Sequence, residues 1–496
     1  MSAIGLRQTI VIALFAILLL SSGTAHGQNT VWSGHYGGYY NDAGYSSAPT
    51  TDGGLFVAGS TYSFGNGDHD IYVLKVDSIG DTLWSRTFGG ASTDFGRDVI
   101  ATNDSGCIVV GSTASSGAGK EDMIILAVNS DGSLRWSKTY GGANSDEAWS
   151  VRSTSDGNLI VCGTTSSSGA GYGDLWLFKM SMTGDSIWAR TFGGVGGESG
   201  MAVREAFDGY VAIGSTGSFG AGYSSIYAVK TSFAGDSVWA KTFGGDKADN
   251  GYALEISNFG DYVIAGATSS YGLGYNDAYI VDISPDGNVM WEQTYGGTKD
   301  DRAYSIRTTP SGDLIVGGTT ESFGAGAVDM YLLKLNPIGG VIWSKTYGGT
   351  LSDYCRNVSI DLKGNYLLSG YSYSYATGGT DLYMLSVTGD SPTPVEELPI
   401  ESLPDGYALF QNYPNPFNGA THIQFTLPRR AAVTLTIYNV LGQQVRRFEE
   451  STHSAGLFQL DWDGTDDRHS EVASGIYFYS LTTSDLTITK KMILVK

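Results

Sequence analysis

The sequence predicts an all-β protein, in which a seven-bladed β-propeller closed by its N-terminal strand precedes an Ig-like β-sandwich. Three observations support this prediction. A tryptophan motif recurs at a near-constant interval, each interval holds four short β runs, and the final stretch of the chain leaves the period and changes composition. Abundant glycine (70 residues) and aromatic residues (12%) suit the turns and strands of such a fold.

The recurring motif has the form Trp-Ser-Lys-Thr-Tyr-Gly-Gly, as at 136–142, and its first copy is the weakest. Successive copies begin 51 or 52 residues apart, at Trp32, Trp84, Trp136, Trp188, Trp239, Trp291 and Trp343. A constant period over most of a chain is the signature of a repeat architecture. We expect each Trp to fill the gap between neighbouring blades. We expect the glycine pair to supply positive φ where the chain turns inward.

One period, residues 146–194, illustrates the predicted blade. Alternating or apolar runs occupy about 148–154, 158–165, 174–180 and 186–192, and Asp-Gly turns or Gly-rich loops separate them. Four such runs joined by tight turns make an antiparallel meander. We label these strands A, B, C and D from the first to the last.

The count of strands predicts how the ring closes. Seven A–B–C modules lie between residues 43 and 387, but only the first six are followed by a D strand. The missing strand occurs at the other end of the chain, as Val31-Trp-Ser-Gly-His-Tyr. Its pairing with the last module would close a propeller over 31–388, whereas an open solenoid would normally carry capping repeats.

Carboxylates recur at two positions of the repeat, four residues after the glycine pair and at the start of strand C. The first set is Asp42, Asp94, Asp146, Glu198, Asp249, Asp301 and Asp353, and the second is Asp70, Asp122, Asp174, Asp277, Asp329 and Asp381, with Ser225 in the fourth module. We expect both sets on one face, accepting hydrogen bonds from turn amides. Ca²⁺ binding is the alternative, which we disfavour because strands A and C of one blade lie roughly 10 Å apart.

No recognisable motif for catalysis or metal binding occurs, so we assign no catalytic, metal-binding or cofactor-binding residues. Cys107, Cys162 and Cys355 occupy unrelated positions of their repeats, which is not the pattern of a disulfide framework or metal cluster. His69, in the first B–C loop, is expected to be an ordinary exposed residue. The alternative is a carbohydrate-active or redox enzyme with its active site on the loop face, where Ser225 is one of the few departures from symmetry.

The N-terminus, residues 1–27, predicts a secretory signal peptide. Arg7 precedes an apolar run, Ile10 to Leu20, that is too short for a typical membrane span, and small residues then favour cleavage between Gly27 and Gln28. An uncleaved anchor is the alternative. No other stretch is long and apolar enough to span a membrane, and the net charge of −21 argues against nucleic acid and anionic membrane surfaces as partners.

The 52-residue period stops near the end of the seventh module. Residues 389–406 are rich in Pro and Glu, which favours an extended spacer. Residues 407–496 contain short β runs with turns between them, including 421–427, 432–438 and 476–481, as expected for a small Ig-like sandwich.

Several motifs follow one another in this C-terminal segment. They are Phe410-Gln-Asn-Tyr-Pro-Asn-Pro-Phe-Asn, Leu435-Thr-Ile-Tyr-Asn-Val-Leu-Gly, Trp462-Asp-Gly-Thr-Asp, Ala473-Ser-Gly-Ile-Tyr and Lys490-Lys-Met-Ile-Leu-Val-Lys. The segment resembles a type IX secretion C-terminal sorting domain and is similar to the Ig-like domain of flagellar hook-cap proteins. The resemblance implies export across the outer membrane of a Gram-negative bacterium, and it leaves open whether the domain is removed. An ordinary Ig-like module without a role in export is the alternative.

The repeats carry a second resemblance. Segments such as Ser155-Asp-Gly-Asn-Leu-Ile-Val-Cys-Gly resemble the seven-bladed propeller repeats of bacterial secreted and surface proteins. Residues 284–291 are also similar to the Trp-containing repeats of quinoprotein propellers, but those usually have eight blades and no matching cofactor residues occur here. We therefore expect a secreted or cell-surface binding or adhesion protein, delivered by the type IX machinery, whose propeller binds an unidentified glycan or protein.

Overall fold

The structure, a computed structural model, describes residues 29–389 apart from residue 259, and most of 408–495. The short gaps in the second range lie at 410–411, 413–414, 416, 420, 428–430, 441, 454–455, 468–469, 471 and 484–486. The predicted signal peptide, its cleavage site at Gly27 and Gln28, and nearly all of the linker 389–406 fall outside the described residues. Within them, no helix has the length and apolar character needed to cross a membrane. The chain divides into two compact units, Met1–Pro392 and Thr393–Lys496.

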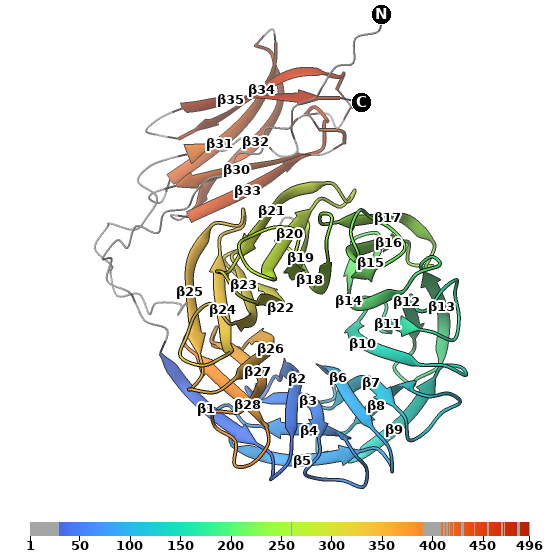
Figure 1. The fold of residues 1–496 in the computed structure, drawn as a ribbon. Coiled ribbons are helices and arrows are strands. Elements are labelled where there is room, and N and C mark those ends of the chain that lie inside the picture. Colours follow the sequence, from blue (N-terminus) through green and yellow to red (C-terminus); the bar gives the residue numbers. More distant parts are fainter. Residues whose placement is uncertain are drawn as a thin grey trace, which may run out of the picture. The chain divides into compact units, whose positions relative to one another are not determined.

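The first unit is a ring of seven four-stranded antiparallel sheets (Figure 1). From the inner to the outer strand, the blades are β2 (Asp42–Pro49), β3 (Leu55–Thr61), β4 (Asp70–Val76) and β5 (Thr82–Phe88); β6 (Asp94–Ala101), β7 (Cys107–Thr113), β8 (Asp122–Val128) and β9 (Leu134–Tyr140); β10 (Asp146–Ser153), β11 (Leu159–Thr165), β12 (Asp174–Met180) and β13 (Ser186–Phe192); β14 (Glu198–Ala206), β15 (Gly209–Thr216), β16 (Ser225–Thr231) and β17 (Ser237–Phe243); β18 (Asp249–Ile256), β19 (Tyr262–Thr268), β20 (Asp277–Ile283) and β21 (Val289–Tyr295); β22 (Asp301–Thr308), β23 (Leu314–Thr320), β24 (Asp329–Leu335) and β25 (Val341–Tyr347); and β26 (Asp353–Ile360), β27 (Tyr366–Ser372), β28 (Asp381–Val387) and β1 (Thr30–Tyr36).

The N-terminal strand closes the ring, as the sequence predicts. β1 pairs antiparallel with β28, from Thr30 opposite Val387 to Tyr36 opposite Leu382, and completes the last blade. Trp32 and Tyr36 of β1 pack against a buried cluster that includes residues of the first and last blades. The predicted fold class, a seven-bladed propeller closed by its first strand, is therefore confirmed.

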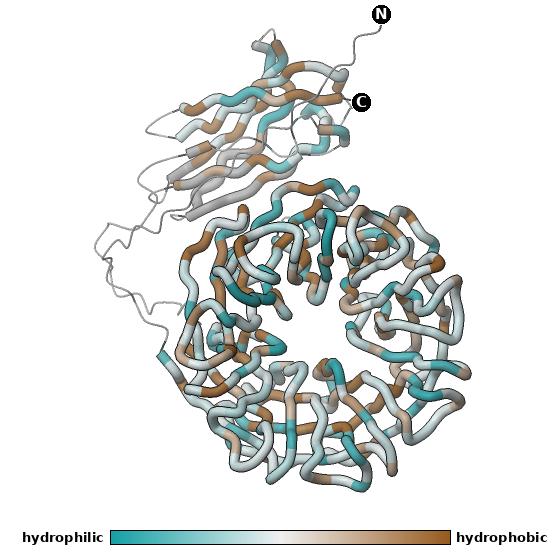
Figure 2. The backbone as a smooth tube through the Cα atoms, viewed as in Figure 1, coloured by the Kyte–Doolittle hydropathy of each residue, from teal (hydrophilic) through white to brown (hydrophobic). Residues whose placement is uncertain are grey.

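Strand burial in each blade follows the sequence pattern. The B and C strands, such as β3 and β4, are buried along their whole length, whereas the outer D strands are mostly exposed. Figure 2 shows apolar segments in the strands of every blade. Trp84 of β5 packs against a cluster that contains residues of the next blade, and its indole N–H donates to Ser130 O there at 2.8 Å. The Trp of the motif fills the gap between blades, as predicted.

A β-bulge on every inner strand positions the site described below. The pairing of β6 with β7 shifts register between Gly96 and Asp98, so that Arg97 is the extra residue. The same shift occurs in the other six blades, three residues after the acidic residue that begins each inner strand. Because a bulge re-aims the side chain of its extra residue, each blade presents one such side chain at the centre of the ring.

The second unit is a two-sheet sandwich. One sheet contains β29 (Ala408–Leu409), β30 (Thr421–Leu427) and β33 (Gly456–Trp462), and the other contains β32 (Gln444–His453), β31 (Ala431–Asn439), β34 (Gly475–Thr482) and β35 (Thr487–Leu494). Trp462 is fully buried between them, with Phe417 and Tyr477 against its ring. This sandwich is the predicted Ig-like fold.

Candidate functional site: the central channel

The repeated carboxylates of the loop face have structural partners. Asp146 accepts hydrogen bonds from the amide of Gly142 at 2.8 Å, from Ser167 Oγ at 2.6 Å and from the Thr165 hydroxyl. Asp174, which opens strand C of the same blade, accepts from the amide of Ala170 at 2.9 Å. Equivalent amide bonds recur around the ring, which agrees with the interpretation of these carboxylates as turn scaffold. The satisfaction is incomplete, because one buried oxygen each of Asp42, Asp94, Asp301 and Asp381 has no hydrogen-bond partner among the described residues.

The carboxylates nevertheless pair in a way that the sequence does not suggest. Strand C of one blade lies beside strand A of the next, so a Cβ atom at Gly37 would come within 2.6 Å of carboxylate oxygens of both Asp42 and Asp381. Burial, with a contribution from the Asp42 charge, raises the pKa of Asp381. The expected reason for the glycine pair holds only in part: Gly244 has a φ of 116°, whereas Gly37, Gly193 and Gly348 adopt no positive φ. Glycine is needed because a side chain would collide with the two carboxylates.

A different and more varied set of side chains faces the centre of the ring. The bulge positions of blades 1 to 7 hold Tyr45, Arg97, Trp149, Met201, Tyr252, Tyr304 and Arg356, all of them half-buried. They surround a cavity of about 450 Å³ to which all seven inner strands contribute. This volume is in the range of small-molecule sites, and the centre of the ring is therefore the candidate functional site.

Arg97 is held by aromatic rings. The centre of its guanidinium lies 4.3 Å from the ring centroid of Trp149, 4.4 Å from that of Phe95 and 5.1 Å from that of Tyr45. Among the described residues, no carboxylate forms an ion pair with Arg97. Aromatic contacts fix the position of a cation without neutralising its charge.

Arg356 is held in the same manner in the last blade. Its guanidinium lies 4.4 Å from the ring of Tyr304 and 5.5 Å from that of Tyr371, and its Nη2 donates to Tyr371 Oη at 2.9 Å. It too forms no ion pair with a carboxylate in the described part of the chain. Burial raises the pKa of Tyr371, so this phenol stays protonated at neutral pH.

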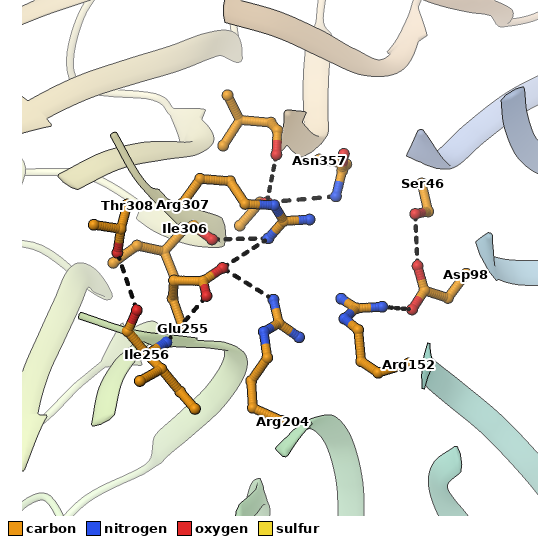
Figure 3. Close-up of polar contacts among 12 residues, drawn as sticks. Ser46, Asp98, Arg152, Arg204, Glu255, Ile256, Ile306, Arg307, Thr308 and Asn357 are labelled. Carbon is orange, nitrogen blue, oxygen red and sulfur yellow. Dashed lines mark hydrogen bonds and ion pairs between the residues drawn. The ribbon is translucent and has the colours of Figure 1, made fainter. Parts of the chain in front are cut away.

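A second tier of charges lies three residues beyond the bulge position in four of the inner strands, at Arg152, Arg204, Glu255 and Arg307. Asp98, one residue beyond the bulge of β6, joins this tier, and Figure 3 shows all five side chains. Arg152 pairs with Asp98 at 2.6 Å. Glu255 lies between two arginines, with Oε2 3.2 Å from Arg204 Nη2 and 3.9 Å from Arg307 Nη1. Three guanidiniums in this tier thus share two carboxylates.

The pKa shifts of this tier have clear causes. Burial opposes ionisation of Asp98, but Arg152 and hydrogen bonds from Ser46 and the Val151 amide outweigh it and lower the pKa. Burial likewise opposes ionisation of Glu255, and the two neighbouring arginines again lower its pKa. Burial and the nearby Arg204 lower the pKa of Arg307 to about 10, which leaves it charged at neutral pH. Burial and the neighbouring Arg152 also lower the pKa of Arg204.

Three buried polar atoms at the cavity have no hydrogen-bond partner among the residues that the structure describes. They are Nε of Arg97, Nε of Arg356 and Oγ of Ser150, a residue that is only 2% exposed. The five arginines that line the cavity, with Asp98 and Glu255, carry a formal net charge of +3 at the centre of a chain whose net charge is −21. Glu147 is a further carboxylate near Arg97, and burial raises its pKa. The site combines uncompensated positive charge with unused donors, which is the complement of an anionic ligand.

Sequence reasoning missed this site. It followed the positions that are the same in every blade, whereas the channel uses a position that differs from blade to blade. Two arginines and four aromatic residues at one register position of seven repeats are a signal that alignment of the repeats could have revealed. The loop-face residues singled out earlier, His69 and Ser225, do not line the cavity. The three cysteines are buried, and burial raises the pKa of Cys107 and Cys355 to about 12.

Comparison with known families identifies part of the chain. Residues 413–486 match the family described as the FlgD Ig-like domain, in agreement with the resemblance to hook-cap proteins. A WD repeat-containing protein of Acanthamoeba polyphaga mimivirus is 28% identical over 110 residues, which is 21% of this chain and 8% of that protein. This chain thus spans a small part of that relative.

Solved structures with a similar fold have low sequence identity. PorZ, a bacterial surface component of the type IX secretion system of Porphyromonas gingivalis, has a TM-score of 0.43 at 13% identity, over 93% of this chain and 60% of that one. The extracellular domain of a hybrid two-component system from B. thetaiotaomicron has a TM-score of 0.43 at 10% identity, over 95% and 60%. The Pan2 WD40 domain of Neurospora crassa has a TM-score of 0.46 at 11% identity, over 74% and 96%. Likeness at these identities concerns fold and not function.

Proposed function

We propose that this protein is an exported or cell-surface binding protein whose propeller takes an anionic ligand into its central channel. The observation that carries the proposal is the set of contacts made by Arg97 and Arg356. Each guanidinium is held by aromatic rings beside the cavity, and neither forms an ion pair with a carboxylate of the described residues. A cation that is positioned but not neutralised is suited to an ion pair with a ligand.

The channel is better suited to binding than to acid–base catalysis. Asp98, which lines the channel, and Glu255 beside it are paired with arginines that lower their pKa, so neither is a ready proton donor at neutral pH. Burial raises the pKa of Glu147, but this residue does not line the cavity. Burial raises the pKa of Tyr252 as well as that of Tyr371, which disfavours a phenolate base. A binding or adhesion role agrees with these directions.

Delivery through the C-terminal unit is the second part of the proposal. The match of 413–486 to an Ig-like domain and the ordered motifs up to Lys490 support a sorting role for 407–496. We propose that the signal peptide is removed between Gly27 and Gln28, and that the type IX machinery then recognises the sandwich. The mature propeller would act outside the cell.

Binding is tested on the full mature chain with Arg97→Ala/Arg356→Ala. We expect the unmodified protein to bind acidic glycans from a glycan array, with affinity that falls as salt rises. The double variant should lose at least tenfold in affinity. Arg190→Ala is the matched control, because Arg190 lies over Trp188 on an exposed outer strand, away from the channel. Binding of neutral glycans alone, or unchanged binding by the double variant, would overturn this site.

Export is tested by cell fractionation in a host with type IX secretion. Deleting 407–496 should leave the propeller in the periplasm, whereas fusing 407–496 to an unrelated periplasmic protein should carry that protein to the surface or medium. Periplasmic retention of the fusion would show that the sandwich is an Ig-like module without a sorting role.

A further inference from the structure

We infer, on the basis of the proposed function, that the ligand of the channel is a short acidic oligosaccharide, with carboxylate or sulfate groups carried on sugar rings. A bare anion would need only the arginines. Apart from Asp98 and a few aliphatic side chains, the remaining lining of the cavity consists of aromatic rings and small hydroxyl or amide side chains. This part of the lining distinguishes a sugar from other anions.

The aromatic part of the lining is extensive and fixed. Tyr45, Trp149, Tyr252, Tyr304 and Tyr371 all border the cavity. Tyr252 and Tyr304 are stacked with their centroids 5.1 Å apart, and Tyr354 and Tyr371 with theirs 4.7 Å apart. Rigid aromatic surfaces can pack against the apolar C–H faces of a sugar ring, and their phenol groups can hydrogen-bond its hydroxyls. A small aliphatic acid would leave most of this surface unused.

The polar part of the lining suits hydroxyl groups. Ser150 Oγ is buried at the cavity without a partner, and Ser305 Oγ has only long contacts, of 3.4 Å to Val358 O and 3.5 Å from Asn357 Nδ2. Buried polar groups without partners cost free energy unless a ligand or water satisfies them. One cavity therefore presents both hydroxyl and aromatic groups, which suit the hydroxyl and C–H surfaces of a sugar.

The two tiers of charge indicate more than one anionic group. Arg97 and Arg356 belong to the bulge tier, whereas Arg152, Arg204 and Arg307 lie three residues further along their strands. The second tier retains one uncompensated positive charge, because its three guanidiniums share Asp98 and Glu255. A ligand with acidic groups on successive rings could meet both tiers.

The size of the cavity and the charge of the protein limit the ligand to a short chain. About 450 Å³ accommodates two or three sugar rings within the usual size of small-molecule sites. The net charge of −21 repels a long polyanion over the rest of the surface. A short acidic oligosaccharide, or the end of a longer one, meets both limits.

The experiment is isothermal titration of the full mature chain with five probes. Trigalacturonic acid carries carboxylates, a heparin-derived disaccharide carries sulfates, maltotriose is the neutral sugar, and glutarate and inorganic phosphate are anions without a sugar ring. We expect one of the two acidic sugars to bind at least tenfold more tightly than each of the other three. Which of the two binds identifies the source of the negative charge.

Variants separate the two parts of the lining. Tyr252→Ala should weaken the acidic sugar at least tenfold and change glutarate binding less than threefold, because Tyr252 lines the cavity and stacks on Tyr304 instead of holding Arg97 or Arg356. Arg356→Gln should weaken both. Arg356→Lys should restore part of the affinity, and thermal unfolding of each variant checks that the ring is intact. Equal affinity for glutarate and the acidic sugars, still dependent on Arg97 and Arg356, would overturn the sugar inference and leave anion binding in place. Failure of all four charged probes to bind would overturn both.

Discussion

Two rings of side chains repeat around the propeller, and they behave in opposite ways. The ring at the start of each inner strand is nearly uniform, with six Asp and one Glu, and each member accepts hydrogen bonds from neighbouring amides or hydroxyls through at least one oxygen. The ring three residues further on holds Tyr, Arg, Trp and Met, and its two arginines form no ion pair with a carboxylate among the described residues. The same seven strands therefore carry a scaffold ring and a ligand ring, and uniformity across the repeats distinguishes one from the other.

The largest effect on stability is expected from deletion of a structural strand that contributes no residue to the channel. Deleting β1 strips β28 of its outer partner and exposes the cluster against which Trp32 and Tyr36 pack. We expect a loss of roughly 5 kcal/mol or more in the free energy of unfolding, from the lost burial and the lost strand pairing. Urea unfolding measures it, with Trp32→Ala as the milder comparison. A stability equal to that of the intact chain would contradict closure by β1.

The fifth blade departs from the repeat at Asp282, and this departure should make the stability of the protein depend on pH. Where other blades carry a buried Lys paired with a turn Asp, such as Lys334 with Asp313, the fifth blade has Asp282 near Asp261. Burial and the Asp261 charge raise the pKa of Asp282 to about 7. Asp282 is therefore protonated in the folded protein between about pH 4 and 7, where the unfolded chain is ionised. Stability should fall by roughly 4 kcal/mol as pH rises through that window.

Replacement of Asp282 tests this pH dependence. Asp282→Asn should flatten the fall in stability between pH 4 and 7, and Asp282→Lys should stabilise the protein at pH 8 by restoring the pairing seen in other blades. Thermal unfolding across pH measures both. A fall in stability of the same size in Asp282→Asn would assign the pH dependence to other groups.

Loss of a single carboxylate from the scaffold ring should have a smaller but clear effect. Asp146→Ala leaves the Gly142 amide and two hydroxyls without their acceptor, which should cost about 3 kcal/mol. Asp131→Ala, in an exposed turn, is the control and should cost little. Ligand affinity should not change in either folded variant. A chelator that lowers the melting temperature of the unmodified protein would instead favour Ca²⁺ at this ring.

The smallest expected effect on stability belongs to the ligand ring. Arg97→Ala and Arg356→Ala each remove aromatic contacts but no ion pair, so the free energy of unfolding should change by about 1 kcal/mol or less. Urea unfolding of each variant, alongside the titrations above, makes the contrast with Asp146→Ala direct. A loss as large as that of Asp146→Ala would place these arginines in the scaffold.

The sequence by itself determined the features that rest on local spacing. The tryptophan period predicted the number of blades. The extra strand beginning at Val31 predicted closure of the ring, because the last module lacks an outer strand and leaves the edge of its third strand free for pairing. The partners of Asp146 followed from a turn four residues long, since Gly142 and Asp146 are close in any such turn. These features depend on residues that are close in the sequence or on a pattern that repeats along it, so they can be predicted without the tertiary structure.

Only the tertiary structure decided which side chains meet across blades. Asp42 and Asp381 lie against the same glycine although they are at opposite ends of the propeller sequence. Arg97 likewise lies over Trp149, which belongs to the next repeat. The bulge that turns Arg97 and Arg356 inward is a feature of strand pairing with no residue signature of its own. The central cavity exists only once seven blades enclose it. Its chemistry depends on the sum of seven different side chains at one register position, and no single repeat contains that information.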